Sequence, residues 1–420
     1  MKMVLIIVSS SIACYKAVDV CSSLKKLGYN IKVIMTKNAT KMISPLIFET
    51  LTKNKVYVDM FCDKDSNYVS HIQLVKEASK VIVLPATANL IAKMANGIAD
   101  DFASTALLVA KPKDIMVFPA MNTNMYENCI TQKNISTLRN YGMSIIEPVT
   151  GHLACDDIGK GKLPSVDFVL DNIVFFLEKT NEYMNKNILI TAGGTREKID
   201  PVRYITNNSS GKMGYSLAKM ASLMGANVTL VSTRRNLKLP VNLKEVIYCD
   251  SAQEMYDIVM SKKNNMDYII KCAAVSDFKV KNVCDKKIKK DDMKEFKIDL
   301  ELNKDILLEL SKTENRHFTL VGFAAESNNI MENAKKKLKK KNLDYLILND
   351  ISDKSIGFNS DYNEVYVLNK NDEVKKIQKD TKDNIAKKIL ESIKENNYEW
   401  NTIGKIYSLC KDKYKIWWKK

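Results

Sequence analysis

The sequence has little of the material from which metal centres, disulfide frameworks and membrane spans are built. Nine cysteines are scattered without a C-x-x-C pair, and only three histidines accompany them. We therefore expect no zinc site. We expect a cytoplasmic protein whose cysteines are reduced. No apolar run approaches the roughly eighteen residues that cross a bilayer, so no membrane partner is expected. The apolar opening Met3–Val8 is too short for a secretion signal and leads into an amphipathic pattern, which favours a strand followed by a helix.

Positive charge is present in excess, mainly in the second half. The net charge is +16, with 20 basic and 16 acidic side chains up to residue 180 and 45 and 33 after it. Nucleic acid, a triphosphate with an acidic substrate, or a generally lysine-rich composition would each account for this excess. The lysines are not interleaved with stacking aromatic residues. We therefore expect no nucleic-acid partner.

Short apolar runs alternate with helical patterns along the chain, which is typical of parallel sheets covered by helices on both faces. The predicted strands are Met3–Val8, Ile31–Met35, Val81–Leu84, Ile115–Phe118, Ile188–Thr191, Val228–Val231, Tyr268–Ile270, Thr319–Phe323 and Tyr345–Leu348. A chain of 420 residues is too long for one ordinary core. The sequence therefore predicts an α/β protein with two tandem Rossmann-like domains.

The expected domain boundaries follow changes in composition. A first domain should span 1–177, a polar linker 178–187, a second domain 188–400, and a basic tail 401–420, next to Trp400, is rich in aromatic residues. Within the second domain, the charged segment 285–292 should form a loop or exposed hairpin. The lysine-rich segment 333–342 should form a basic helix.

The stretch Pro201–Gly214 combines hydroxyl, amide and glycine residues between an expected strand and a helix near 213–224. Backbone N–H groups at such a helix start can bind an anion. An ordinary helix cap with a glycine turn would use the same residues. It is not a Walker loop, because Met213 stands where Ser or Thr would hold magnesium, and it does not fit G-x-G-x-x-G.

Small and hydroxyl residues end several expected strands of the first half. An open parallel sheet places its ligands at the carboxyl ends of its strands, where they can contact the phosphate and ring of a mononucleotide. Helix capping would also explain the serines. The predicted cofactor-binding residues are Ser9, Ser11, Thr36, Ala86 and Thr87.

Three further segments of the first half carry groups suited to proton transfer and carboxylate binding. His71 can carry a proton near neutral pH, the amide of Asn122 can bind a carboxylate, and Cys155 in a glycine-bearing loop can donate a proton. Each residue alone is as readily structural. Their order along the chain makes them a candidate site.

This order resembles a known family. Ser-x-Ser-Ile-Ala-x-Tyr-Lys at 9–16, His71, Pro-Ala-Met-Asn-x-x-Met-Tyr at 119–126 and Ala-Cys-x-Asp-Ile-Gly at 154–159 are similar to the flavin-dependent cysteine decarboxylases. Together with residues 192–197 and 200–214, they resemble the bifunctional phosphopantothenoylcysteine decarboxylases/phosphopantothenate–cysteine ligases of coenzyme A biosynthesis. The resemblance covers about residues 3–370.

For the first half, the resemblance implies a flavodoxin-like flavoprotein fold that binds FMN. The flavin would oxidise the substrate thiol to a thioaldehyde, carbon dioxide would leave, and the hydride would return to the enethiol product. His71 would be the base or orienting group, Asn122 would bind the departing carboxylate, and Cys155 on a lid would protonate the product.

For the second half, the resemblance implies a nucleotide-binding α/β fold that joins 4′-phosphopantothenate to cysteine with CTP and Mg²⁺, through an acyl-cytidylate. Lys287 would stabilise its developing charge, Asn207 with Arg203 would hold it, and Asp277 is also the candidate magnesium ligand. The lysine register within 286–290 stays open, and Lys337 with Lys341 would equally suit a solvated helix face. The implied CTP-binding residues are Ala273, Asp277, Lys287, Asp305, Ile306, Phe323, Lys337 and Lys341.

Three alternatives remain: a flavoprotein of the same fold with other chemistry, a regulatory binding module, and a nucleic-acid-binding protein. The positions of Asn122 and Cys155 argue against the first. The regulatory relatives carry acidic or low-complexity extensions, which this chain lacks. The resemblance also implies a homo-oligomer.

Overall fold

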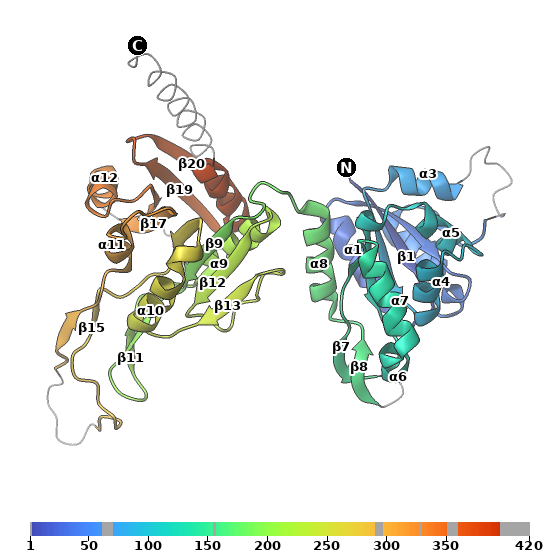
Figure 1. Ribbon diagram of the computed structural model, residues 1–420, viewed down its shortest axis with the longest axis horizontal. Coiled ribbons are helices and arrows are strands. Elements are labelled where there is room, and N and C mark those ends of the chain that lie inside the picture. Colours follow the sequence, from blue (N-terminus) through green and yellow to red (C-terminus); the bar gives the residue numbers. More distant parts are fainter. Residues whose placement is uncertain are drawn as a thin grey trace, which may run out of the picture. The chain divides into compact units, whose positions relative to one another are not determined.

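The structure is a computed structural model that describes residues 2–60, 70–153, 157–289, 297–326, 330–350 and 360–394. The chain divides into two compact units, Met1–Glu178 and Lys179–Lys420, and each is described by itself (Figure 1).

The first unit is built on a six-stranded parallel sheet in the order β3-β2-β1-β4-β5-β6. The four strands that the apolar runs predict in this half are confirmed to within two residues at each end. Both faces of the sheet are buried, which is why the strands are continuously apolar. Its strands are β1 (Met3–Val8), β2 (Asn30–Met35), β3 (Val56–Tyr57), β4 (Lys80–Ala86), β5 (Ile115–Pro119) and β6 (Ser144–Ile145).

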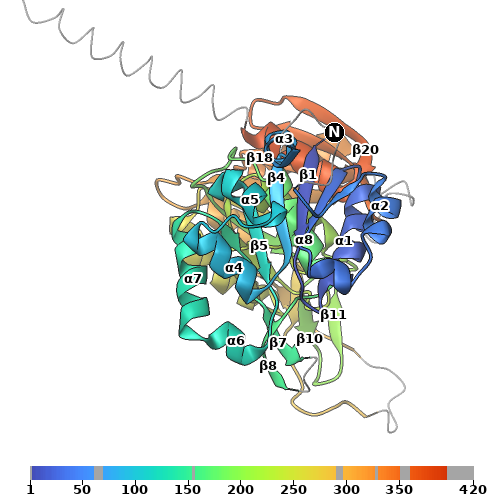
Figure 2. The same cartoon turned by 90° about the vertical axis from the view of Figure 1, so that its right-hand side faces the viewer.

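Two hydrophobic cores cover the two faces of this sheet, and Figure 2 shows α1 and α2 on one side and α4, α5 and α7 on the other. Helices α1 (Cys14–Lys26), α2 (Pro45–Thr52) and α8 (Val166–Glu178) pack on one face; α3 (Ser70–Glu77), α4 (Ala88–Asn96), α5 (Phe102–Val109) and α7 (Cys129–Asn140) pack on the other. The short α6 (Thr123–Glu127) and the hairpin β7 (Val149–His152)–β8 (Ile158–Lys162) follow β5 and β6 in the chain.

The strand order 3-2-1-4-5-6 is that of a doubly wound dinucleotide-binding sheet. The order becomes that of flavodoxin when the two-residue edge strand β3 is left out. The α/β fold class expected for this half is confirmed.

The second unit repeats this order. Its sheet runs β13-β12-β9-β14-β17-β18, with parallel pairing throughout, and continues through the antiparallel strands β19 and β20. The strands are β9 (Asn187–Ala192), β12 (Asn227–Ser232), β13 (Glu245–Tyr248), β14 (Tyr268–Lys271), β17 (Thr319–Glu326), β18 (Tyr345–Asp350), β19 (Tyr362–Asn369) and β20 (Val374–Thr381).

The helices of the second unit again lie on both faces. Helix α9 (Lys212–Leu223) and the helical residues 382–394 share one core, while α10 (Ala252–Lys262), α11 (Ile306–Ser311) and α12 (Ile330–Lys340) share the other. Two small hairpins, β10 (Arg196–Lys198)–β11 (Tyr204–Thr206) and β15 (Phe278–Val280)–β16 (Leu300–Leu302), extend from the unit. None of the helices in the described residues has the length and apolar character needed to span a bilayer.

The segment expected as a linker is partly packed into the second unit. Tyr183 is 1% exposed, its hydroxyl donates to the carbonyl of Leu390 at 2.6 Å, and its ring stands edge-on to Tyr268. A single aromatic residue among polar neighbours gave no periodic signal, so this contact was not predicted. The charged segment 285–292 is a loop as far as residue 289, the basic helix ends at Lys340, and the tail 401–420 lies outside the described residues.

Helix α9 lies unusually close to β9. A Cβ atom built on Gly214 would meet the Cβ of Ala192 at 2.6 Å and the carbonyl oxygen of Thr191 at 3.1 Å. Only a glycine fits there without moving the helix away from the strand.

We predict that Gly214→Ala destabilises the second unit by about 1–3 kcal/mol, because a rigid strand is in the way. Alanine normally stabilises a helix over glycine by about 0.5–1 kcal/mol, so the sign is diagnostic. Urea denaturation of the full chain, followed by hydrogen exchange within α9, measures the change. The control is Ser216→Ala in the same helix. A Gly214→Ala protein more stable than wild type would contradict this packing.

Candidate active sites

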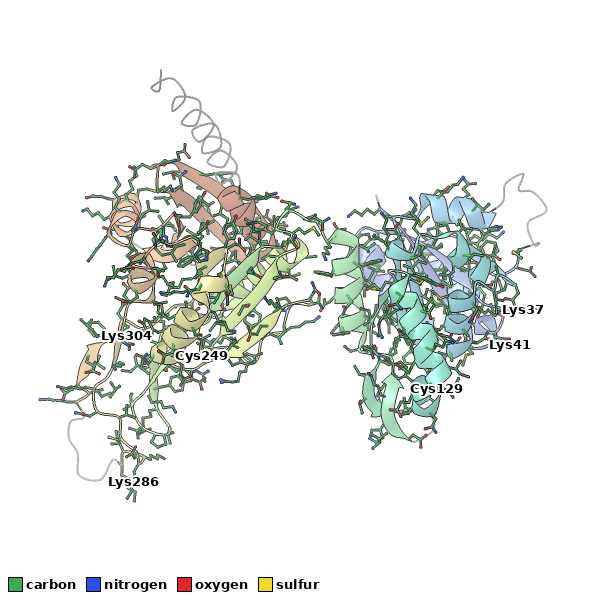
Figure 3. The ribbon with its side chains drawn as sticks, in the orientation of Figure 1. Lys37, Lys41, Cys129, Cys249, Lys286 and Lys304 are labelled. Carbon is green, nitrogen blue, oxygen red and sulfur yellow. The ribbon has the colours of Figure 1, made fainter. Side chains whose placement is uncertain are left out.

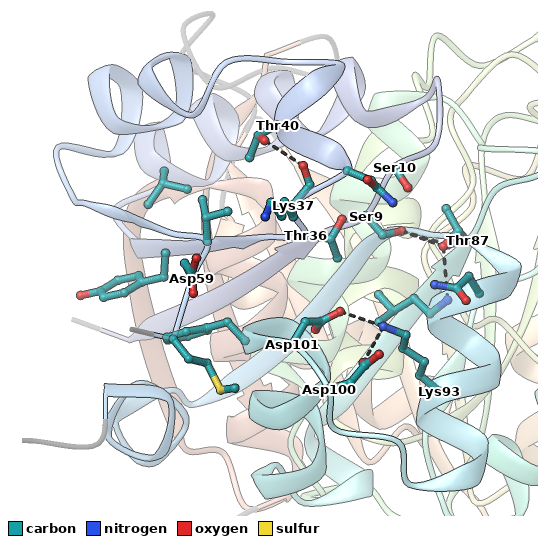
Figure 4. Close-up of a pocket in the computed structure, with 18 of the residues that line it drawn as sticks. Ser9, Ser10, Thr36, Lys37, Thr40, Asp59, Thr87, Lys93, Asp100 and Asp101 are labelled. Atoms are coloured by element: carbon teal, nitrogen blue, oxygen red, sulfur yellow. Dashed lines mark hydrogen bonds and ion pairs between the residues drawn. The ribbon is translucent and has the colours of Figure 1, made fainter. Parts of the chain in front are cut away.

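A cavity of about 790 Å³ lies in the first unit, where β1, β2 and β4 end. Figure 4 shows Ser10, Thr36 and Lys37 on the β1 and β2 side and Thr87 on the β4 side. Asn38, Thr40 and Asn89 add further polar groups to the lining. A polar-walled cavity at this edge of a doubly wound sheet is suited to a nucleotide-like cofactor.

Several of the predicted cofactor residues hold the cavity together. Ser9 is 1% exposed, and its hydroxyl donates to the carbonyl of Pro85 at 2.8 Å and accepts from the backbone N–H of Thr87 at 3.0 Å. Thr87 caps α4 through the N–H of Leu90. Ala86 is fully buried. These contacts tie β1 to β4 and fix the spacing of the two strand ends.

The remaining two predicted residues differ in position. Thr36 lines the cavity, and its hydroxyl also accepts from the N–H of Ala39. Ser11 accepts from the N–H of Ala13 at 3.4 Å and is not part of the lining. Ser10, which lies between Ser9 and Ser11 in the same turn but is not among the five predicted cofactor-binding residues, does line it. Helix capping and ligand exposure have the same sequence signal, so only the structure separates them.

An ion-pair cluster forms part of the same wall. Lys93 pairs with Asp100 at 2.6 Å and with Asp101 at 2.9 Å (Figure 4). Burial by itself would lower the pKa of Lys93, but hydrogen bonds to the two carboxylates outweigh it and raise the pKa. The ammonium group of Lys93 therefore stays charged and paired with the two carboxylates of the cavity wall.

His71 contacts the cavity wall, whereas Asn122 follows β5, the strand beside β4, and is not part of the cavity lining. His71, in the first turn of α3, meets the ring of Phe102 edge-on, and Phe102 lines the cavity. Asn122 follows β5 and caps α6, with its Oδ1 accepting from the N–H of Asn124 at 2.8 Å. Its Nδ2 donates to Asp157 at 3.3 Å. Cys155, two residues before Asp157, lies outside the described residues.

In the second unit, Asp200 brings two predicted site segments together. Its buried carboxylate accepts N–H groups from Val202 at 2.8 Å, Arg203 at 2.7 Å and Ile288 at 3.2 Å. Burial disfavours the ionised form, but these donors outweigh it and lower the pKa of Asp200. Arg203 in turn donates to the carbonyl of Ile288 at 2.9 Å. Sequence reasoning named Arg203 and Lys287 but missed the carboxylate that joins their loops.

Lys287 itself is exposed on this loop, and Lys286 beside it lies where the loop extends away from the sheet (Figure 3). Asn207 reaches the loop after β14, where its Nδ2 donates to the carbonyls of Ala274 and Val275, both at 3.3 Å. The predicted residues Asn207 and Ala273 are thus brought to one edge of the sheet.

A second chain of contacts joins the other predicted nucleotide residues. Asn303 donates its backbone N–H to the carbonyl of Asp277 at 2.8 Å. Asp305, at the start of α11, forms an ion pair at 2.6 Å with Lys341, the residue directly after α12. Ile306 is buried directly behind Asp305. Lys337 is one helical turn before Lys341, so both face this cluster.

A smaller cavity of about 150 Å³ lies between the loop 209–211 and the ends of β14, β17 and β18. Ala273 and Phe323 line it, as predicted for nucleotide contacts. Asn349 and Lys382 also line it and were missed. Among the residues that the structure describes, none donates a hydrogen bond to the buried Oδ1 atom of Asn349. Burial lowers the pKa of Lys382. Lys382 follows strands β19 and β20, which no sequence pattern predicts, so no motif points to it.

Comparison with known proteins matches this arrangement to one family. The flavoprotein family model covers residues 1–178, and the model of the DNA/pantothenate metabolism flavoprotein C-terminal domain covers 183–397. The coenzyme A biosynthesis bifunctional protein CoaBC of Vibrio vulnificus (strain YJ016) is 46% identical over 367 residues, which are 87% of this chain and 90% of that protein. The CoaBC protein of Bacillus subtilis (strain 168) is 42% identical over 396 residues, 93% of this chain and 96% of that one.

The chain belongs to the family of coenzyme A biosynthesis bifunctional proteins. A solved structure of the C-terminal domain of a CoaBC protein is 39% identical, with a TM-score of 0.45, and covers 52% of this chain and 100% of that domain. Like its family, the chain is a bifunctional enzyme, a phosphopantothenoylcysteine decarboxylase and a phosphopantothenate–cysteine ligase.

In this coenzyme A biosynthesis enzyme, we predict that Asp200→Asn lowers the ligase rate about 10- to 100-fold. An amide cannot accept all three N–H groups, so the Arg203 and Lys287 loops shift relative to each other. The decarboxylase rate with phosphopantothenoylcysteine should not change. Assaying both activities on one preparation makes this comparison.

The matched control is Asp285→Asn, which removes an exposed carboxylate from the same loop. Equal ligase rates in the Asp200→Asn and Asp285→Asn proteins would show that the carboxylate does not position the site.

Proposed function

We propose that the second unit joins 4′-phosphopantothenate to cysteine through an acyl-cytidylate made from CTP, with release of CMP and pyrophosphate, and that the first unit decarboxylates the product with FMN. The observation that carries this proposal is a cavity at the carboxyl edge of each of two separate sheets, lined in part by Ser9, Thr36 and Thr87 in one and by Ala273 and Phe323 in the other. The family assignment supports the two reaction types.

In the ligase half, activation of the pantothenate carboxylate needs positive charge near the attacked phosphate. Lys287 would supply this positive charge, together with Arg203, whose backbone is held in place by Asp200. Asn207 would hold the acyl-cytidylate, because its amide is already positioned over the loop after β14. Mg²⁺ usually binds through one or two carboxylates together with substrate phosphates, a role open to the exposed Asp277.

In the decarboxylase half, the cavity fits FMN, since hydroxyl and amide groups from three strand ends surround a space of about 790 Å³. When bound, FMN would supply reversible hydride transfer, and the thioaldehyde formed from the substrate thiol would accept the electron pair left by the departing carbon dioxide. Thr36 and Ser10 would contact the cofactor. Asn122 would direct its amide to the substrate carboxylate, and His71 would hold or accept a proton. Cys155 remains the predicted proton donor.

The oligomeric state and the cellular location of the protein also remain predictions. We propose a homo-oligomer in the cytoplasm, which sedimentation and cell fractionation would test; a strictly monomeric protein would contradict the first.

We predict that Asn122→Ser lowers carbon dioxide release about 100-fold or more and leaves CMP release unchanged. Serine preserves the cap of α6 but removes the amide donor that would bind the carboxylate. Carboxyl-labelled phosphopantothenoylcysteine measures the loss. Asn124→Ser, on the same helix, should retain the full rate. Loss of FMN from the Asn122→Ser protein, read from its visible spectrum, would count against a role in substrate binding.

We predict the reverse pattern for Lys287→Gln: CMP release falls about 100- to 1,000-fold, as for loss of a charge-stabilising donor, while decarboxylation is unchanged. Lys286→Gln and Lys289→Gln are the matched controls on the same loop. A large loss in either control, with Lys287→Gln active, would move the role to that neighbour.

A further inference from the structure

Lys271 ends β14 at the edge where the nucleotide residues gather. In the sheet it lies between Thr191 of β9 and Gly322 of β17, so neither register neighbour carries a charge. Its side chain is half-buried. Among the described residues, its ammonium forms no hydrogen bond and no ion pair. Burying an ammonium group that has no hydrogen-bond or ion-pair partner is unfavourable. A bound anion would supply the partner that Lys271 does not find among the described residues.

Charged groups from three elements surround it. Asp277 comes from the loop after β14, Asp305 from the start of α11, Lys337 from α12, and Lys341 from the turn directly after α12. Asp305 is already paired with Lys341 at 2.6 Å and accepts the N–H of Leu308 at 3.2 Å. Three ammonium groups therefore face two carboxylates. The cluster therefore carries an excess of positive charge, which a further anion would neutralise.

The protonation of Lys271 reflects this surplus. Burial, aided by Lys341 and Lys337 and opposed by Asp305 and Asp277, lowers the pKa of Lys271 to about 8. A lysine near half-protonation at that pH gains its full charge when an anion arrives.

We propose that Lys271 is a further nucleotide-binding residue of the ligase site, one that contacts the polyphosphate and not the nucleoside. This rests on the proposed use of CTP. A polyphosphate is the substrate group whose charge matches three converging ammonium groups, and none of the sequence motifs pointed to this lysine. Binding should couple to proton uptake, because the polyphosphate raises the pKa of Lys271 from its lowered value. The uptake should be about half a proton at pH 8 and should vanish below about pH 6.5, where the lysine is already protonated.

Isothermal titration of the full chain at pH 8 tests this, with CTP plus Mg²⁺ and with CMP, in two buffers of different ionisation enthalpy. Lys271→Met should weaken CTP binding about 10- to 100-fold, the range for a lost charged hydrogen bond, and abolish proton uptake. Affinity for CMP should change less than about 3-fold. Methionine has a similar length and tolerates burial, so the fold should persist.

Two further variants make the result specific. Lys271→Arg should keep CTP affinity within about 3-fold but lose the proton uptake, because arginine does not titrate. Lys340→Met, which removes an exposed charge from α12, should keep both affinity and uptake.

The inference fails if Lys271→Met binds CTP as wild type does, or if CTP and CMP affinities fall together with proton uptake intact. If the wild-type protein binds ATP in place of CTP, the cytidylate proposal fails instead, and the same comparison with ATP and AMP then decides the role of Lys271. Binding of neither nucleotide would overturn both.

Discussion

Both halves of the enzyme depend on one geometric constraint: neighbouring parallel strands end at the same edge of a sheet. Loops that are far apart in the sequence therefore meet, and polar residues placed after buried strands become neighbours. In the first unit this edge is formed by β1, β2 and β4, and in the second by β14, β17 and β18. The repeated 3-2-1-4-5-6 order gives each half such an edge.

The motif residues at these edges divide into two kinds. Some face the cavities, such as Thr36 and Phe323. Others position the loops that do so: Ser9 joins β1 to β4, and Asp200 joins the Arg203 and Ile288 loops. Positioning contacts use buried, fully satisfied hydrogen bonds, which makes them rigid. The residues of a motif therefore include those that position the loops as well as those that face the ligand.

The sequence was sufficient where burial leaves a periodic pattern. Continuously apolar strands such as β1 and β9 were predicted because parallel sheets bury both faces. Strand β20 was not predicted, because Ile377 is its one buried residue and the other seven are exposed or partly exposed. The site residues Arg203, Asn207 and Lys287 came from resemblance, whereas Asp200 and Lys382 required the three-dimensional contacts.

The two activities form a reaction sequence, because the amide made by the ligase carries the cysteine carboxylate that the decarboxylase removes. The most direct test is one incubation of the wild-type chain with 4′-phosphopantothenate, carboxyl-labelled cysteine, CTP, Mg²⁺ and FMN. CMP and labelled carbon dioxide should form in equal final amounts, with CMP appearing first. Release of CMP without carbon dioxide, or of neither, would contradict this reaction sequence.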